Sequence, residues 1–202
     1  MSISKLWTLT RPAFALVSRR TMSTPTSDTN TTDAPLFASP QEERKWNQLS
    51  AQMSNFHNYF KQEFNQLYKL ADGSYERRGL SLTDYLDTAR SLDHHLTMHH
   101  TIEERFFFPR LAKKLPQFDK NSQDRAHLES HEGIHQGLVN LMALVSKFEE
   151  DQTSYSPVEM RACLDSFRDV LFNHLDEEVE DLKGSNLKKH FTLQEFNGLL
   201  MH

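Results

Sequence analysis

Apolar residues recur at spacings of three and four along four stretches of this sequence, which is the repeat of an amphipathic helix. The stretches cover approximately 40–70, 82–111, 121–148 and 157–182. Their apolar positions are Trp46, Leu49, Met53, Phe56, Phe60, Phe64, Leu67, Tyr85, Leu86, Ala89, Leu92, Leu96, Phe106, Leu111, Leu128, Ile134, Leu138, Leu141, Val145, Phe148, Met160, Leu164, Phe167, Leu171 and Leu182. The pattern therefore predicts four long helices.

Residues that favour helix ends mark the same four stretches. The sequence Ser-Pro-x-Glu occurs at 39–42 and again at 156–159, placing a capping serine before a proline and a glutamate at the third helical position. We expect Asn121 or Ser122 to cap the third helix and Gly184 to end the fourth. Loops are expected at 72–79, near 113–118 and near 150–156.

Four helices of similar length joined by short loops most economically form an antiparallel up-and-down bundle. The expected fold class is therefore all-α, with one four-helix bundle over residues 39–184. The segment TLQEFNGLL at 192–200 predicts a short fifth helix across one end of the bundle, within a C-terminal tail of residues 185–202. A length of 202 residues fits a single domain.

The composition excludes several classes of protein. Cys163 is the only cysteine, so neither a disulfide within the chain nor a cysteine-based zinc or iron–sulfur site is expected. There is no run of about 18 apolar residues, so no membrane span is expected. The formal net charge of -5 argues against a nucleic acid as partner, because phosphate binding requires a cationic surface.

The first part of the chain differs from the rest in its charge. Residues 1–27 contain Lys5, Arg11, Arg19 and Arg20 and no acidic residue, with apolar residues between these basic ones. Such a segment is typical of mitochondrial targeting, so we expect residues 1–22 to direct the protein to mitochondria. A start at Met22 would instead give a cytoplasmic form. Residues 23–38 are rich in serine, threonine, aspartate and proline and are expected to form a disordered linker.

Histidines are unusually numerous, with 11 in 202 residues, and their spacing is the strongest chemical signal. Residues four apart share a helix face, so their donor atoms point into the same space. Three pairs with this spacing lie on three different predicted helices, and a single histidine lies on the remaining one. These residues are His57, His99 with Glu103, His131 with His135, and His174 with Glu178. At a rise of about 1.5 Å per residue, all of them fall within about 9 Å of one level in the bundle.

A buried layer of five imidazoles and two carboxylates predicts a metal site. Without a cation, desolvation and like-charge repulsion in such a layer would cost several kcal/mol. Imidazole suits iron, zinc, copper or nickel, and two carboxylates are enough to bridge two ions. Seven ligands exceed what one ion normally accepts, so we expect two metal ions. Among the remaining histidines, His127 is the strongest alternative ligand, and the others, including His100, are expected at the surface or behind the ligands.

The same segments resemble a known family. HHTIEERFFFPRL at 99–111, HEGIHQGL at 131–138 and HLDEEVEDL at 174–182 are similar to the motifs of the hemerythrin-like, or HHE cation-binding, domain, and the similarity extends over about 41–183. The resemblance implies a four-helix bundle that holds two non-haem iron ions joined by an oxygen bridge. It assigns His131, His135 and His174 to one iron, His57 and His99 to the other, and Glu103 and Glu178 to both.

Two details of the motifs refine this assignment. His99 is selected over His100 because Glu103 lies six residues before Pro109, as it does in the family. Glu178 stands where the oxygen carriers of the family have aspartate, which argues against reversible oxygen transport. The expected surroundings of the ligands are Glu104 and Arg105 facing solvent, Phe106, Phe107 or Phe108 along the wall of the site, and Pro109 at a kink in the second helix.

The function implied by the resemblance is binding or sensing of a small ligand. O2, NO or peroxide would occupy the coordination position that seven protein ligands and the bridge leave open. A di-iron oxidoreductase acting on peroxide, NO or ferrous iron is the second hypothesis, and iron storage or structural metal binding is the third. Since the sequence has no nicotinamide or flavin motif, we expect a ligand-binding protein rather than an enzyme.

Overall fold

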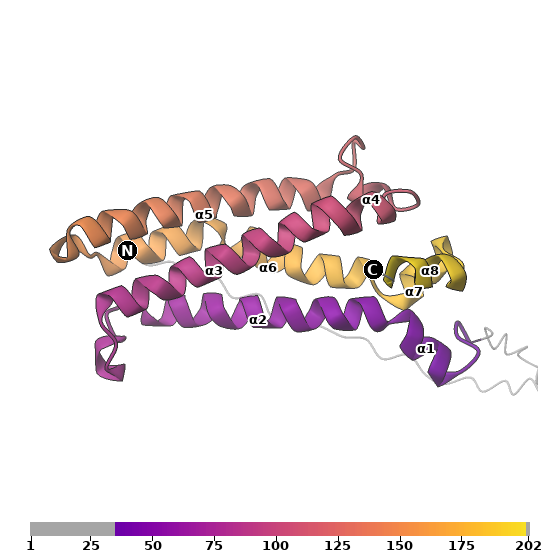
Figure 1. Ribbon diagram of the computed structural model, residues 1–202, viewed down its shortest axis with the longest axis horizontal. Helices are drawn as coiled ribbons and strands as arrows, with labels where there is room; N and C mark the ends of the chain where they lie inside the picture. Colours follow the sequence, from indigo (N-terminus) through magenta and orange to yellow (C-terminus); the bar gives the residue numbers. More distant parts are fainter. Residues whose placement is uncertain (1–34, 201–202) are drawn as a thin grey trace, which may run out of the picture. The chain divides into compact units, whose positions relative to one another are not determined.

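The computed structural model describes residues 35–200, and every regular element among them is a helix (Figure 1). The expected all-α fold class is thus confirmed for this part of the chain. The expected targeting segment and most of the linker lie outside the described residues. No helix among the described residues is both long and apolar enough to cross a membrane.

Four long helices surround a shared core. They are α2 (Gln48–Leu70), α3 (Leu82–Ile102), α5 (Ala126–Glu150) and α6 (Pro157–Asp181). Helix α2 packs against α3 and α6, and α5 also packs against α3 and α6, so the contacts close into a ring (Figure 1). The shorter elements are α1 (Pro40–Trp46), η1 (Glu76–Arg78), η2 (Glu103–Phe107), α4 (Phe108–Leu111), η3 (Pro116–Phe118), η4 (Gln152–Ser154), α7 (Gly184–His190) and α8 (Leu193–Leu200).

Serine caps begin three of these helices, two of them at the predicted Ser-Pro sequences. The Ser39 hydroxyl accepts a hydrogen bond from the Glu42 amide at 3.1 Å, and Ser156 caps α6 through Glu159 in the same way. The expected cap of α5 at Asn121 or Ser122 is wrong, because α5 begins at Ala126. Asn121 and Ser122 instead take part in local turns with Asp119 and Asp124, which compete with helix formation.

The apolar core consists of two clusters, one on each side of a polar layer. The larger cluster fills the space between the four long helices and includes Phe64, Leu92, Leu141, Phe167 and Leu171. The smaller one includes Trp46, Leu49, Phe108, Leu182, Leu187 and Phe196. Helices α7 and α8 contribute to this second cluster, so the C-terminal segment packs against the bundle.

Gly184 does not end a helix as expected but permits two helices to approach closely. It is the first residue of α7, and its amide donates to the Asn47 side-chain oxygen at 2.9 Å. A Cβ atom on Gly184 would lie 2.6 Å from the Trp46 Cβ, which is closer than packed atoms tolerate. The glycine therefore serves the contact between α7 and the junction of α1 with α2.

Gly137 and Gly133 provide a matched test of packing on α5. A Cβ on Gly137 would lie 2.3 Å from the Phe167 Cγ, whereas on Gly133 it would be 3.5 Å from a Val170 methyl group. Replacing Gly137 by alanine is expected to lower the free energy of unfolding by about 1–3 kcal/mol because of the clash. Gly133→Ala should raise it by about 0.5–1 kcal/mol through better helix propensity. Urea denaturation measures both, and equal effects of the two changes would contradict the α5–α6 contact.

Candidate metal centre

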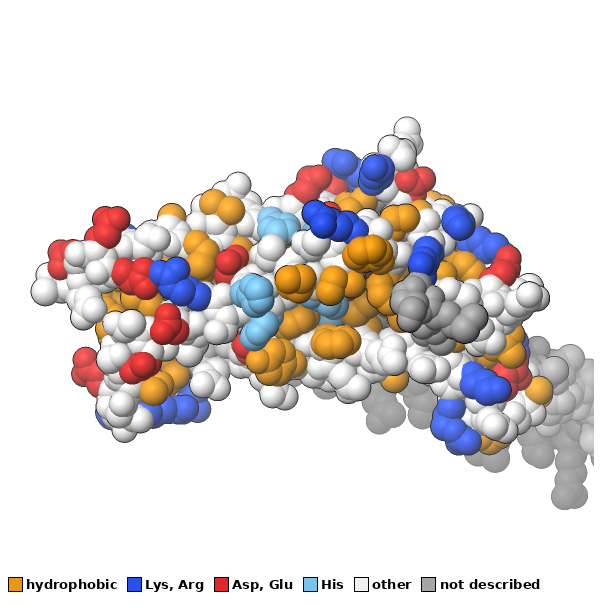
Figure 2. Space-filling view, viewed as in Figure 1, with side chains coloured by type: hydrophobic (Ala, Val, Ile, Leu, Met, Phe, Trp, Pro, Cys, Tyr) orange, Lys and Arg blue, Asp and Glu red, His pale blue; other side chains and the backbone are white. Residues whose placement is uncertain are grey.

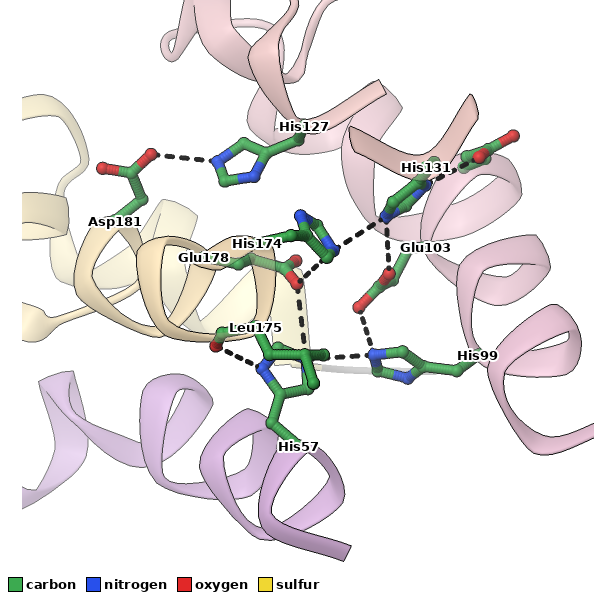
Figure 3. A network of polar contacts seen from close by, with 10 residues as sticks. His57, His99, Glu103, His127, His131, His174, Leu175, Glu178 and Asp181 are labelled. Atoms are coloured by element: carbon green, nitrogen blue, oxygen red, sulfur yellow. Dashed lines mark hydrogen bonds and ion pairs between the residues drawn. The ribbon is translucent and has the colours of Figure 1, made fainter. Parts of the chain in front are cut away.

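The polar layer between the two clusters contains six of the seven predicted ligands. Figure 3 shows their side chains converging from different helices. They are His57 on α2, His99 on α3, Glu103 at the first residue of η2, His131 on α5, and His174 and Glu178 on α6. All are buried except His99, whose side chain is 11% exposed. These six residues thus lie together in one layer of the bundle, as their spacing in the sequence predicted.

A π-helical turn, η2, controls which residues of the second long segment face inward. The Phe108 amide bonds to the Glu103 carbonyl, a span of five residues instead of the four of an α-helix. Buried positions follow α-helical spacing from Leu96 through His100 to Glu103, and the next one is Phe108. The expectation that Phe106 lies on the apolar stripe is therefore wrong, and its side chain is 56% exposed.

The ligand atoms form two groups that share one carboxylate. The first group is His57, His99, Glu103 and Glu178, and the second is His100, Glu103, His131 and His174. Within each group, the possible ligand atoms all lie within 4.8 Å of one another. The arrangement can hold two neighbouring cations with Glu103 between them.

A backbone hydrogen bond fixes the proton on the His57 ring in the first group. The Nδ1 atom donates to the carbonyl of Leu175 at 2.7 Å, so Nε2 carries a lone pair when the ring is neutral (Figure 3). This Nε2 lies 3.1 Å from the Nε2 of His99 and 3.4 Å from Oε2 of Glu178. The two ring nitrogens and the carboxylate oxygen therefore surround a position suited to a cation.

In the second group, a carboxylate instead of a backbone carbonyl orients a histidine ring. The Nδ1 of His131 lies 2.7 Å from Oε1 of Glu104, which favours a lone pair on Nε2. This Nε2 is 3.1 Å from the Nε2 of His174 and 3.5 Å from Oε2 of Glu103. Glu104 was expected only to face solvent, but although its side chain is 41% exposed it also orients His131. Nothing in the sequence around Glu104, which directly follows Glu103, indicated that it would orient His131.

The buried polar atoms of the centre fit a pair of cations. Both ring nitrogens of His100 are buried without a hydrogen-bond partner, and the buried carboxylates of Glu103 and Glu178 face the ring nitrogens of the centre, with Oε1 of Glu103 2.9 Å from Nε2 of His99. Such atoms are costly in a protein interior unless a cation or donor satisfies them. Two imidazole nitrogens bound to one ion at about 2.0–2.1 Å lie roughly 3 Å apart. The two close nitrogen pairs described above have this separation.

Burial governs the protonation of the centre. Desolvation lowers the pKa of His99 to about 4 and, together with the charge of His99, lowers the pKa of His57 to about 3. Desolvation raises the pKa of Glu103 and of Glu178 well above the usual carboxyl range. The pKa is also lowered, mainly by burial, in His100, His131 and His174. Without a cation, burial therefore favours neutral imidazoles and disfavours ionised carboxylates in the centre.

His135 is the predicted ligand that the structure leaves outside both groups, and His100 is the residue that sequence reasoning missed. His100 is fully buried, and its ring stacks on His131 with a centroid distance of 3.8 Å. It also meets the ring of His135 edge-on at a centroid distance of 5.9 Å. The expectation that His100 lies at the surface or behind the ligands is corrected, whereas a role of His135 in binding iron stays a prediction.

His127, the alternative ligand, points away from both groups. Its Nε2 lies 3.0 Å from Oδ2 of Asp181, and its ring stacks on Phe118 at a centroid distance of 4.5 Å. The hydrogen bond from His127 is the main cause of a lowered Asp181 pKa.

Three phenylalanines were expected along the wall of the site. Of these, Phe108 stacks against His131 at a centroid distance of 5.3 Å, whereas Phe106 is exposed.

Comparisons with known proteins bear on the identity of this bundle. A curated relative, the Dimeric xanthone biosynthesis cluster protein R11 of Cryptosporiopsis sp. (strain 8999), is 30% identical over 132 residues, which is 65% of this chain and 47% of the relative. The chain thus spans about half the length of that relative. No solved structure was found to match the chain.

Residues 48–184 match the model of a protein family, the Hemerythrin HHE cation binding domain. This range begins with α2, ends at the start of α7, and includes every member of both ligand groups. The resemblance seen in the sequence is therefore confirmed, and the chain belongs to the hemerythrin family of HHE cation-binding domains.

Proposed function

We propose that this protein is a hemerythrin-like up-and-down four-helix bundle that holds two non-haem iron ions and binds or senses O2, NO or peroxide. The observation that carries the proposal is the pair of buried ligand groups joined by Glu103. The mixture of imidazoles and carboxylates suits iron. We place one ion among His57, His99, Glu103 and Glu178, and the other among His100, Glu103, His131 and His174.

The side chains around the centre serve to hold and orient the ligands. Iron, when bound, would supply a redox-active centre with an open position for a small ligand. The Leu175 carbonyl and the Glu104 carboxylate keep two imidazole rings in the orientation that presents Nε2. The apolar clusters lie on both sides of the polar layer and shield most of its ligands from bulk water. As carboxylates, Glu103 and Glu178 would balance the charge of the cations.

An oxidoreductase acting on peroxide, NO or ferrous iron is the second candidate. The partial exposure of His99 favours this second candidate. The other predicted ligands in the two groups are at most 2% exposed. An external molecule can thus reach one side of the centre. Turnover measured with each of these three substrates would distinguish an enzyme from a binding protein.

Anaerobic titration with ferrous iron tests the proposal. We expect about two ions to bind per chain, with release of protons, because burial raises the pKa of the Glu103 and Glu178 carboxyls in the metal-free centre. Metal analysis and a weakly buffered pH measurement would record both quantities. After oxidation, azide should change the visible absorption. Purified protein that contains one zinc ion per chain and shows no visible absorption would refute the proposal.

A further inference from the structure

A pocket opens between α2 and α3 and reaches the metal centre. Its volume is 580 Å³, and its lining includes the ligands His99 and Glu103. The walls are formed mainly by Met53, Phe56, Tyr59, Phe60, Met98 and Phe107. Figure 2 shows hydrophobic side chains and histidines together on this face of the molecule, over α2 and α3.

The pocket is much larger than a diatomic ligand requires. A water molecule occupies about 30 Å³ in the liquid, and O2 or NO is of comparable size. Pockets that bind organic molecules typically measure roughly 300–1,000 Å³. The volume of 580 Å³ therefore matches an organic ligand of moderate size.

The walls favour an aromatic ligand. Four of the wall residues carry aromatic rings, which pack best against another ring in offset or edge-on contact. The two methionines add thioethers, which make favourable contacts with rings. Phe56 and Met98 lie at the opening with side chains 57% and 50% exposed, and grouped exposed apolar residues commonly mark a binding site.

The polar end of such a ligand would be a neutral donor. None of the described residues that line the pocket is lysine or arginine. Its basic side chains are His94, the ligand His99 and His95, which already lies 3.0 Å from the Glu63 carboxylate, so an organic carboxylate would lie near Glu103 without a lysine or arginine to pair with it. Glu103 lies in the lining with its carboxylate buried, and its Oε1 is 2.9 Å from Nε2 of His99 while its Oε2 is 3.5 Å from Nε2 of His131. A hydroxyl group can donate to such an oxygen.

We propose that the pocket between α2 and α3 binds a small aromatic molecule bearing a phenolic hydroxyl group, with its ring between the aromatic and methionine side chains and its hydroxyl directed toward Glu103. The proposal rests on the proposed function only in placing that hydroxyl beside an iron ion. The walls of the pocket belong to α2, α3 and η2, and most of them are not metal ligands.

Binding of 2-naphthol to the full chain tests this assignment, with 2-naphthoate as the charged analogue. Calorimetry or naphthol fluorescence should show one naphthol site per chain and at least about tenfold weaker binding of naphthoate. Met98→Glu, which places a charge at the opening, should weaken naphthol binding at least about tenfold. Val139→Glu is the matched control, because Val139 on α5 is also an exposed apolar residue, at 61%, and does not line the pocket.

Iron content and oligomeric state, measured on the same samples, separate the alternatives. Sensitivity of naphthol binding to Met98→Glu in a protein that binds no iron would support the pocket and refute the proposed function. Normal iron content with no naphthol binding, or with equal effects of Met98→Glu and Val139→Glu, would overturn the inference. An affinity for 2-naphthoate equal to that for 2-naphthol would overturn the assignment of a phenolic ligand. A dimer that Met98→Glu dissociates and that excludes naphthol would assign the pocket to a second copy of the chain and also overturn the inference.

Discussion

Replacing Glu103 by alanine is expected to reduce the metal content from about two ions per chain to none. Glu103 belongs to both ligand groups, so its loss removes one bond and part of the compensating negative charge from each ion. The melting temperature of the variant should no longer rise when iron is added, because a metal that does not bind adds nothing to folding. Metal analysis and circular dichroism on heating would measure both effects.

Glu104→Ala is the matched control for this change. Glu104 is adjacent in sequence and more exposed, and it contacts the outer nitrogen of His131 instead of joining either ligand group. Loss of such an orienting carboxylate should weaken metal binding by about 10–100-fold while leaving two sites. Since burial of the Glu103 carboxyl is costly in a metal-free bundle, Glu103→Ala should remain folded. A folded Glu103→Ala protein that retains two ions would exclude a shared carboxylate.

The positions of most ligands could be predicted because they depend on regular helix geometry. His131 and His174 lie on uninterrupted α-helices, and a constant rise of about 1.5 Å per residue brings them to the level of His57. The serine caps at Ser39 and Ser156 could also be predicted, because a cap depends on neighbouring residues alone. Local rules thus determined the helices and most of the candidate site.

The remaining features depend on contacts that no local rule describes. The π-helical turn after Ile102 inserts one residue into the second segment, which exposes Phe106 and buries Phe108. Helix α7 was missed because Gly184 is typical of a helix end, whereas here the glycine permits contact with Trp46 from a segment far away in sequence. The hydrogen bond from His131 to Glu104 likewise joins separate helices.

His100 and His135 give the clearest difference between the two ligand sets. The family resemblance assigns His135 to an iron and leaves His100 out, whereas the described geometry places His100 in a ligand group and His135 outside both. We expect His100→Phe to lower the iron content from about two ions per chain to one, since the ring nitrogens are lost while a ring still packs on His131. His135→Phe should retain both ions. Metal analysis of the two purified variants, with anaerobic iron titration, measures the difference.

The paired design also tests whether the ligand set changes when metal binds. His100 is fully buried and His135 only partly so, and therefore circular dichroism must show that both variants fold before their iron contents are compared. If His135→Phe loses one ion and His100→Phe keeps both, the assignment from the resemblance is correct, and the α5 side chain must turn inward on binding. If each variant loses one ion, both imidazoles bind, and the centre has eight protein ligands, which leave less room for an external molecule.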